Sequence, residues 1–202
     1  MEKWTSPYLT KMSRRYCEKE FILDTKHILK MMNDLKSSNT INNDNYNLFT
    51  IDVEKLYPSI QPQLAEEAIS DLLSNVTDEE VDVAVAVKEF VKISFCESYV
   101  TYKDRVFKPK VGIPTGGSLS RQIADTFLHW VLFKKIRNVM NTYELKFWKR
   151  FIDDGIGIWK GTKRTFISFL KKLNKETKAY GINFPIEEAQ FGKCISSMSR
   201  ST

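Results

Sequence analysis

Apolar and polar residues alternate along this chain with two different periods, and the changes of period divide it into helices and strands. Apolar residues at helical spacing predict four helices, over 20–36, 64–73, 119–140 and 165–178. Short apolar runs with β-branched members predict strands at 46–53 and 182–187. Two further runs, 145–152 and 156–160, predict a hairpin that turns at Asp153-Asp154-Gly155.

The segment from 77 to 111 carries mixed signals. Thr77 and Glu80 have the spacing of a capping box, which predicts a helix to Phe95, although 81–87 alternate as a strand would. After this helix, a second hairpin is predicted to turn at Lys103-Asp104, and a glycine-rich loop follows it. No repeat or linker composition interrupts the chain, so the pattern favours a single α+β domain.

Composition narrows the class of protein. The chain has 202 residues, of which 42% are hydrophobic and 28% charged, and these values exclude a disordered or low-complexity chain. No apolar run reaches the roughly 18 residues of a membrane-spanning helix, and no signal-peptide pattern opens the chain. We therefore expect a soluble intracellular protein without a membrane partner. Its net charge of +6 favours polyanionic partners, and its three dispersed cysteines argue against zinc or a disulfide framework.

Three features could carry chemistry, and each has a simpler reading when taken alone. Asp153-Asp154-Gly155 has the composition of an ordinary turn, and Gly116-Gly117 the composition of a helix entry. Asp52, however, lies in the largely apolar run LFTIDVEKLY, where an ionised carboxylate is costly. Carboxylates that gather in a basic chain repel one another unless cations lie between them. Two magnesium ions about 3.5–4 Å apart would suit nucleotidyl transfer.

Three segments resemble motifs A, B and C of reverse transcriptases, in order and at suitable separations: FTIDVEKLYPSI (49–60), GIPTGGSLSRQIAD (112–125) and RFIDDGIGIW (150–159). Their flanks most resemble the Penelope-like retroelement branch, through DTKHILKMM, SYVTYKDRVFKP and the motif D region YGINFPIEEAQFGK. The resemblance covers roughly residues 5 to 193. It implies a polymerase palm-type antiparallel sheet with helices packed on one face, truncated fingers and no thumb.

The resemblance also implies a division into regions. Residues 1–45 would be a residual fingers-like helical segment, 46–193 the palm with motifs A to D, and 194–202 a polar tail. Fingers and thumb segments would then come from a longer chain. A nuclear location follows from the retroelement resemblance.

Carried over residue by residue, the resemblance assigns Asp52, Asp153 and Asp154 as catalytic carboxylates that bind two Mg²⁺ ions, or Mn²⁺ in their place. Asp154 would coordinate less directly than the other two. The carbonyl of Val53 would be a further ligand. Tyr57 would lie beneath the sugar of the incoming nucleotide, where its ring excludes a 2′-hydroxyl and so selects deoxynucleotides.

Motif B would pass close to the nascent base pair, because its glycines allow the backbone to approach. Many relatives carry Gln at the position of Thr115, so a long amide contact to the nucleotide is not expected here. Lys11, Arg14 and Arg15, which precede the first predicted helix, are weak candidates for the triphosphate, and Lys193 is a weak candidate for the motif D proton donor. The motif B residues assigned to nucleotide or nucleic-acid contact are Pro114, Thr115, Gly116, Gly117, Arg121 and Gln122.

The function that the resemblance implies is an RNA-directed DNA polymerase, which transfers a nucleotide from a dNTP to a primer 3′-hydroxyl. Its partners would be an RNA template, a DNA primer and dNTP. One alternative is a truncated, catalytically inactive nucleic-acid-binding remnant of such a polymerase. An RNA-dependent RNA polymerase would share the carboxylates, but Tyr57 and the PTGGSLS loop disfavour it.

Overall fold

The computed structural model describes residues 2–18, 20, 22, 25–37, 46–74, 81–96, 99–114 and 117–193. The predicted capping box at 77–80 and the polar tail at 194–202 lie outside these residues, as do Thr115 and Gly116. The chain forms two compact units, each assembled from distant segments of the sequence. The first unit joins Met1–Glu18, Lys55–Lys135 and Thr177–Ile182, and the second joins Lys19–Glu54, Ile136–Glu176 and Asn183–Thr202. The region boundaries inferred from the resemblance stay a prediction.

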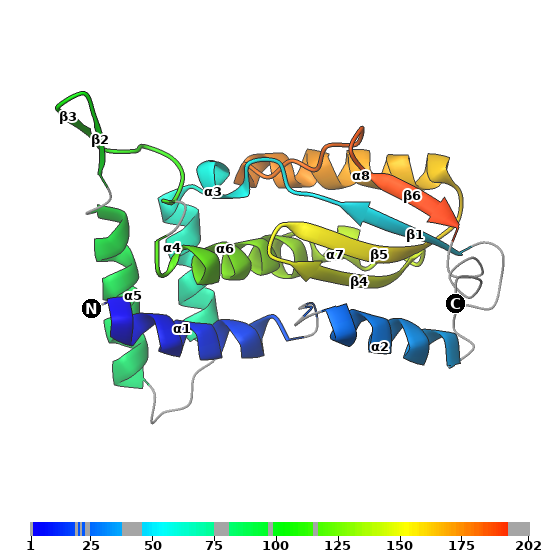
Figure 1. The fold of residues 1–202 in the computed structure, drawn as a ribbon, viewed down its shortest axis with the longest axis horizontal. Coiled ribbons are helices and arrows are strands. Elements are labelled where there is room, and N and C mark those ends of the chain that lie inside the picture. The colour runs from blue at the N-terminus through cyan, green and yellow to red at the C-terminus, as the bar shows by residue number, and fades with distance from the viewer. Residues whose placement is uncertain are drawn as a thin grey trace. The chain divides into compact units, whose positions relative to one another are not determined.

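A four-stranded antiparallel sheet organises the second unit (Figure 1). Its strand order is β4-β5-β1-β6, so β1, which ends just before Asp52, lies beside the predicted hairpin. In the pairing of β1 with β5, Ile51 lies opposite Gly155, and β6 pairs with the other edge of β1. The strands are β1 (Tyr46–Ile51), β4 (Leu145–Phe151), β5 (Asp154–Lys160) and β6 (Gln190–Lys193).

Aromatic side chains fill the space between this sheet and helix α8 (Lys163–Thr177), which confirms the helix predicted at 165–178. The Phe166 ring lies 4.6 Å from that of Phe49 and 5.0 Å from that of Phe191, between ring centroids. Gly157 lies opposite Phe49 across the strands. A Cβ atom at Gly157 would lie 2.3 Å from the Phe49 ring and 2.6 Å from the carbonyl oxygen of Phe147.

We expect the substitution Gly157→Ala to destabilise the second unit by about 1–3 kcal/mol, because neither the backbone carbonyl nor the packed ring is free to retreat. The midpoint of urea unfolding should fall accordingly. Gly192→Ala is the matched control, since nothing lies within 4 Å of a Cβ atom built there. Equal midpoints for the two variants would show that the strand can shift to accept the methyl group.

The predicted strand at 182–187 is wrong, and the strand of this region is β6, at 190–193. The backbone of Phe184 instead bonds to a side chain: its N–H donates to Oδ1 of Asn174, and its carbonyl accepts from Nδ2, both at 2.8 Å. Pro185 has no N–H to donate to a strand ladder. Ile182 and Phe184 are buried without forming a strand.

Helices make up most of the first unit. Helix α1 was not predicted, although Leu9 and Met12 are buried on it. The predicted helix at 64–73 is confirmed as α4. The first unit also contains the short helix α3 and the 3₁₀ turn η3. The bounds are α1 (Glu2–Tyr16), α3 (Leu56–Ser59), α4 (Pro62–Leu73) and η3 (Lys178–Tyr180).

Helix α5 (Val81–Cys96) resolves the mixed signals of its segment in favour of a helix. Ala84, Val87 and Val91 are buried on one face, at the spacing of a helix, while Val85 is exposed. The hairpin of strands β2 (Val100–Tyr102) and β3 (Arg105–Phe107) is also confirmed, with its turn at Lys103 and Asp104. Both turn residues have positive φ, 46° and 60°, as a type I′ turn requires.

The single helix predicted over 119–140 is wrong. Helix α6 (Ser120–His129) is followed by a π-helical turn, η2 (Trp130–Lys135), and α7 (Arg137–Met140) begins after a break at Ile136. The sequence shows one continuous apolar face, and only the backbone hydrogen bonds reveal the change of pitch.

In the second unit, α2 (Thr25–Ser37) begins later than the predicted 20–36. None of the described helices is long and apolar enough to cross a membrane.

Candidate active site

The end of β1 and the turn between β4 and β5 lie at the same end of the sheet in the second unit (Figure 1), and the three predicted catalytic aspartates belong to these two segments. Asp52 directly follows Ile51, the last residue of β1, which pairs with Gly155. Asp153 is in the turn between β4 and β5, and Asp154 is the first residue of β5, opposite Phe151. Carboxylates from two distant segments are therefore neighbours because the β1–β5 register aligns them.

The charges of these side chains act on one another. The pKa of Asp154 is raised, first by partial burial and then by the negative charges of Asp153 and Asp52. Repulsion of this kind weakens steeply with distance and with water between the groups, so the three carboxylates share one local field. A cation bound here would offset this repulsion between the carboxylates.

The raised pKa of Asp154 predicts a pH dependence of stability. The folded chain holds this proton at a higher pH than the unfolded chain does, so the contribution of Asp154 is favourable at low pH and is lost as pH rises through its folded pKa. We expect Asp154→Asn to raise the melting temperature at neutral pH, by a margin that shrinks toward acid. Melting curves across pH test this, with Glu187→Gln, an exposed carboxylate, as control. A margin that is the same at every pH would contradict the coupling.

The backbone after Asp52 is held in place by a short set of hydrogen bonds. Oδ1 of Asp52 accepts from the N–H of Val53 at 2.8 Å, and Val53 itself is buried. The next N–H, from Glu54, donates to the carbonyl of Asn183 at 2.9 Å, and Nδ2 of Asn183 donates to the Glu54 carboxylate at 2.7 Å. Asn183 was not identified from the sequence, because its only signal there was membership of a predicted strand.

The turn that carries Asp153 is positioned by Arg150, whose side chain is fully buried. Its Nε lies 3.3 Å from the carboxylate of Glu20, which is also buried, and its Nη1 donates to the carbonyl of Ile152 at 3.0 Å. The backbones join as well, since the N–H of Arg150 donates to Glu20 and its carbonyl accepts from Ile22. This pair was not identified from the sequence, although a buried arginine on a strand needs an acid to compensate its charge.

The predicted Asp-Asp-Gly turn is shifted by one residue. Phe151 pairs with Asp154, so the two turn residues are Ile152 and Asp153, and Gly155 belongs to β5. Ile152 has φ of 58°, a strained conformation for a β-branched residue. Gly155 serves packing instead, because a Cβ atom there would lie 3.0 Å from the Trp148 ring.

In the first unit, the start of the predicted nucleotide-binding loop lies against Tyr57. The N–H of Ile113 donates to the carbonyl of Tyr57, and the N–H of Gly112 donates to the carbonyl of Ile60, both at 2.9 Å. Gly112 has φ of 91°, and a Cβ atom there would lie 3.0 Å from the backbone of Pro58. The segment assigned to motif B therefore begins beside the end of the segment assigned to motif A.

The other end of this loop is closed at α6. The hydroxyl of Ser120 donates to the carbonyl of Pro114 at 2.6 Å, and the N–H of Ser120 donates to the carbonyl of Gly117 at 3.1 Å. Arg121 is largely exposed and lies 3.7 Å from the Asp125 carboxylate. The Gln122 amide is hydrogen-bonded to the hydroxyl of Thr10 on α1 at 2.8 Å. The nucleic-acid contacts of Arg121 and Gln122 stay predictions.

The weaker candidates are placed as follows. Lys11, Arg14 and Arg15 are exposed residues of α1 itself, which corrects the expectation that they precede the first helix. Lys193 is the last residue of β6, and its side chain lies outside the described part of the chain.

The carboxylate oxygens of the aspartates suit a hard cation that takes its remaining ligands from substrate and water. Within the described residues, no group of three or more His, Cys, Asp or Glu side chains could hold a metal ion by itself. Magnesium is commonly bound by one or two carboxylates plus substrate phosphates and water, so Asp52 and Asp153 offer ligands of the right kind. The excess negative charge around Asp154 favours a cation there.

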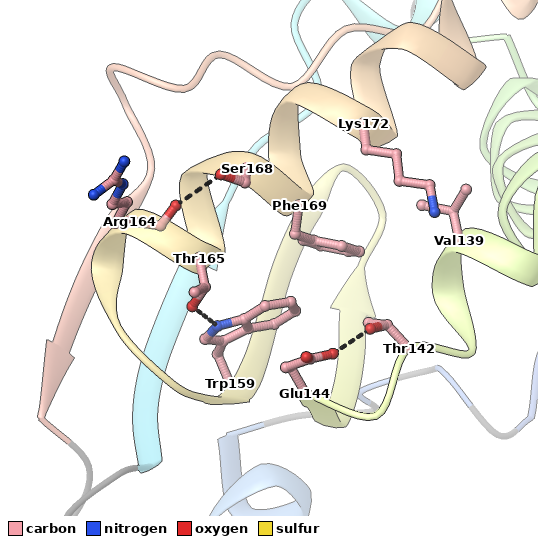
Figure 2. A pocket seen from close by; sticks show the side chains of 9 residues that line it. All are labelled: Val139, Thr142, Glu144, Trp159, Arg164, Thr165, Ser168, Phe169 and Lys172. Carbon is pink, nitrogen blue, oxygen red and sulfur yellow. Dashed lines mark hydrogen bonds between the residues drawn. The ribbon is translucent and has the colours of Figure 1, made fainter.

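A separate cavity of about 360 Å³ lies between α8 and the other end of β5 (Figure 2). The Trp159 ring forms part of its wall, with its Nε1 donating to the Thr165 hydroxyl at 3.1 Å. Thr142 donates to the Glu144 carboxylate, and this bond is the main cause of the lowered pKa of Glu144. Because Trp159 and Asp154 occupy opposite ends of β5, this cavity is distinct from the carboxylate site.

No protein-family model matches the sequence, and no curated protein matches it. Solved structures share its fold. Apo telomerase from Candida tropicalis superposes with a TM-score of 0.72 at 17% identity, over 100% of this chain and 38% of that one. A form truncated from the C-terminal domain gives 0.68 at 16% identity, over 96% and 41%. Telomerase from Candida albicans, in complex with a TWJ fragment of telomeric RNA, gives 0.68 at 12%, over 96% and 34%. This chain therefore spans about two fifths or less of the length of those telomerase chains and shares the fold of that part.

Proposed function

We propose that this chain is the catalytic domain of an RNA-directed DNA polymerase, which transfers a nucleotide from a dNTP to a primer 3′-hydroxyl on an RNA template. The observation that carries the proposal is the alignment of Asp52 with Asp153 and Asp154 at one end of the β1–β5 pair. The fold shared with telomerase supports it. The Candida albicans telomerase structure is a complex with a fragment of telomeric RNA, which agrees with a nucleic-acid partner.

In this proposal Asp52 and Asp153 hold two magnesium ions, with the Val53 carbonyl as a further ligand and manganese as a substitute. Bound ions would lower the pKa of the attacking hydroxyl and neutralise the leaving pyrophosphate. Asp154 coordinates less directly and adds negative charge to the site. The hydrogen bonds of Glu54 and Arg150 hold the two ligand-bearing segments in place before substrate binds.

Tyr57 and the glycine-rich loop have the role of selecting the nucleotide. The ring of Tyr57 would lie under the sugar and collide with a 2′-hydroxyl, so deoxynucleotides would be favoured. Gly112 lets the loop pass against the backbone of Pro58, and Pro114 and Gly117 flank the segment proposed to approach the base pair. Thr115 and Gly116 complete this assignment.

Finer assignments rest on sequence resemblance alone. The Penelope-like branch is proposed from the segments that flank motifs A and B, and a nuclear location follows from that branch. Because the chain spans about two fifths or less of the telomerase chains, fingers and thumb segments from a longer chain are part of the proposal.

A primer-extension assay tests the function. The chain is incubated with an RNA template, a labelled DNA primer, magnesium and either dNTP or rNTP. Extension with dNTP that stops on chelation of the metal supports the proposal. Extension with rNTP at equal efficiency would favour an RNA-dependent RNA polymerase. Tight template binding without extension under any metal would favour the inactive nucleic-acid-binding remnant.

A further inference from the structure

The β2–β3 hairpin of the first unit presents large apolar and basic side chains to solvent. Every residue from 99 to 111 is exposed. The exposed fraction is 63% for Tyr102 and 49% for Phe107, values that a globular protein rarely leaves to rings without a use. Within the described residues this two-stranded sheet has no third strand.

The register of the hairpin sorts its side chains onto two faces. Val100 lies opposite Phe107, and Tyr102 lies opposite Arg105, so these four side chains share one face. Thr101 and Val106 lie opposite each other on the other face. The rings of Tyr102 and Phe107 are diagonal neighbours, and Arg105 is paired directly opposite Tyr102.

Positive charge surrounds this aromatic face. The segment carries four basic residues against a single acid, Asp104. The ammonium group of Lys103 lies 5.5 Å from the centre of the Tyr102 ring, and that of Lys108 lies 5.9 Å from the Tyr99 ring. Two of the ammonium groups of this segment therefore lie over tyrosine rings. The basic residues are Lys103, Arg105, Lys108 and Lys110.

We propose that the face formed by Val100, Tyr102, Arg105 and Phe107 binds a single strand of RNA, with bases stacked on the two rings and phosphates on the basic residues. Aromatic rings interleaved with cations are the combination that sequence-tolerant single-strand binding uses. The choice of RNA rests on the proposed function, in which RNA is the template. The hairpin would be a second contact to that strand, separate from the carboxylates.

The test is fluorescence anisotropy of a labelled, unstructured RNA oligonucleotide titrated with the full chain, without metal or nucleotide. We expect Tyr102→Ala to raise the dissociation constant by about fivefold or more, because stacking on one ring is lost. Arg105→Ala should reduce the slope of log affinity against log salt by about 0.7, since one phosphate contact is lost from a single strand. Val106→Ala, on the other face of the same hairpin, should bind as the wild type does.

Circular dichroism and melting temperature establish that each variant folds, as expected for exposed positions. Equal affinities for Tyr102→Ala and the wild type would overturn the inference, as would an equal loss in Val106→Ala. Duplex DNA bound more tightly than single-stranded RNA would also overturn it. The inference would also be overturned if Tyr102→Ala changed the binding of the chain to anionic vesicles, or its self-association, without changing its affinity for RNA.

The inference and the proposed function can fail separately. If Tyr102→Ala weakens RNA binding but the wild type does not extend a primer, the RNA-binding face stands and the polymerase proposal fails. If the wild type extends a primer and Tyr102→Ala binds RNA normally, the polymerase proposal stands and the RNA-binding face is wrong.

Discussion

Replacing Asp153 by alanine is expected to abolish primer extension, with a loss of about a thousandfold or more, while the chain stays folded. Asp153 supplies one of the two carboxylates proposed to hold the metal ions. Alanine has no side-chain oxygen to bind a metal ion and no negative charge to attract one. The loss of the Asp153 carboxylate also relieves repulsion on Asp154, whose pKa is raised in part by Asp153. The melting temperature without metal should therefore stay level or rise. Extension assays and melting curves on the same preparations measure both effects.

Asp34→Ala is the matched control, because Asp34 is an exposed aspartate of the same unit on α2. It should extend primers as the wild type does. If Asp153→Ala unfolds the domain, Asp153 is a structural turn residue, as the alternative reading of Asp-Asp-Gly holds. If Asp153→Ala extends normally, the catalytic assignment is wrong.

Replacing Glu20 by leucine should have the largest effect on stability, a loss of about 3–5 kcal/mol in the free energy of unfolding. The change leaves the charge of Arg150 fully buried without its acid, and the cost of that uncompensated charge exceeds the value of the contact itself. Urea unfolding measures the loss. The same change frees the Arg150 side chain that bonds to Ile152, so the turn carrying Asp153 should also become less ordered.

The double variant Glu20→Leu with Arg150→Met separates the charge from the packing. Two apolar residues leave no buried charge, and most of the stability should return. Lys134→Met is the surface control, since Lys134 and Asp71 form a partly exposed ion pair at 3.9 Å and such pairs contribute about 1 kcal/mol or less. A loss for Glu20→Leu no larger than for Lys134→Met would mean that water reaches Arg150.

Local pattern determined the elements whose residues repeat with one period. The strand before Asp52, the helix of 165–178 and both hairpins were predicted because their apolar residues fall at one spacing, although the turn of the second hairpin falls one residue earlier than predicted, at Ile152 and Asp153. The resemblance grouped Asp52 with Asp153 and Asp154, and the pairing of β1 with β5 is what brings their segments together.

Only the tertiary structure decided the contacts that hold this site in place. Arg150 and Glu20 are 130 residues apart, and each reads as an ordinary charged residue until both are seen to be buried. Asn174 takes the backbone bonds that a strand at Phe184 would have made, which no local pattern could reveal. The burial and hydrogen bonding of these residues depend on segments distant in sequence. The spacing of apolar residues, which predicts helices and strands, therefore cannot predict these contacts.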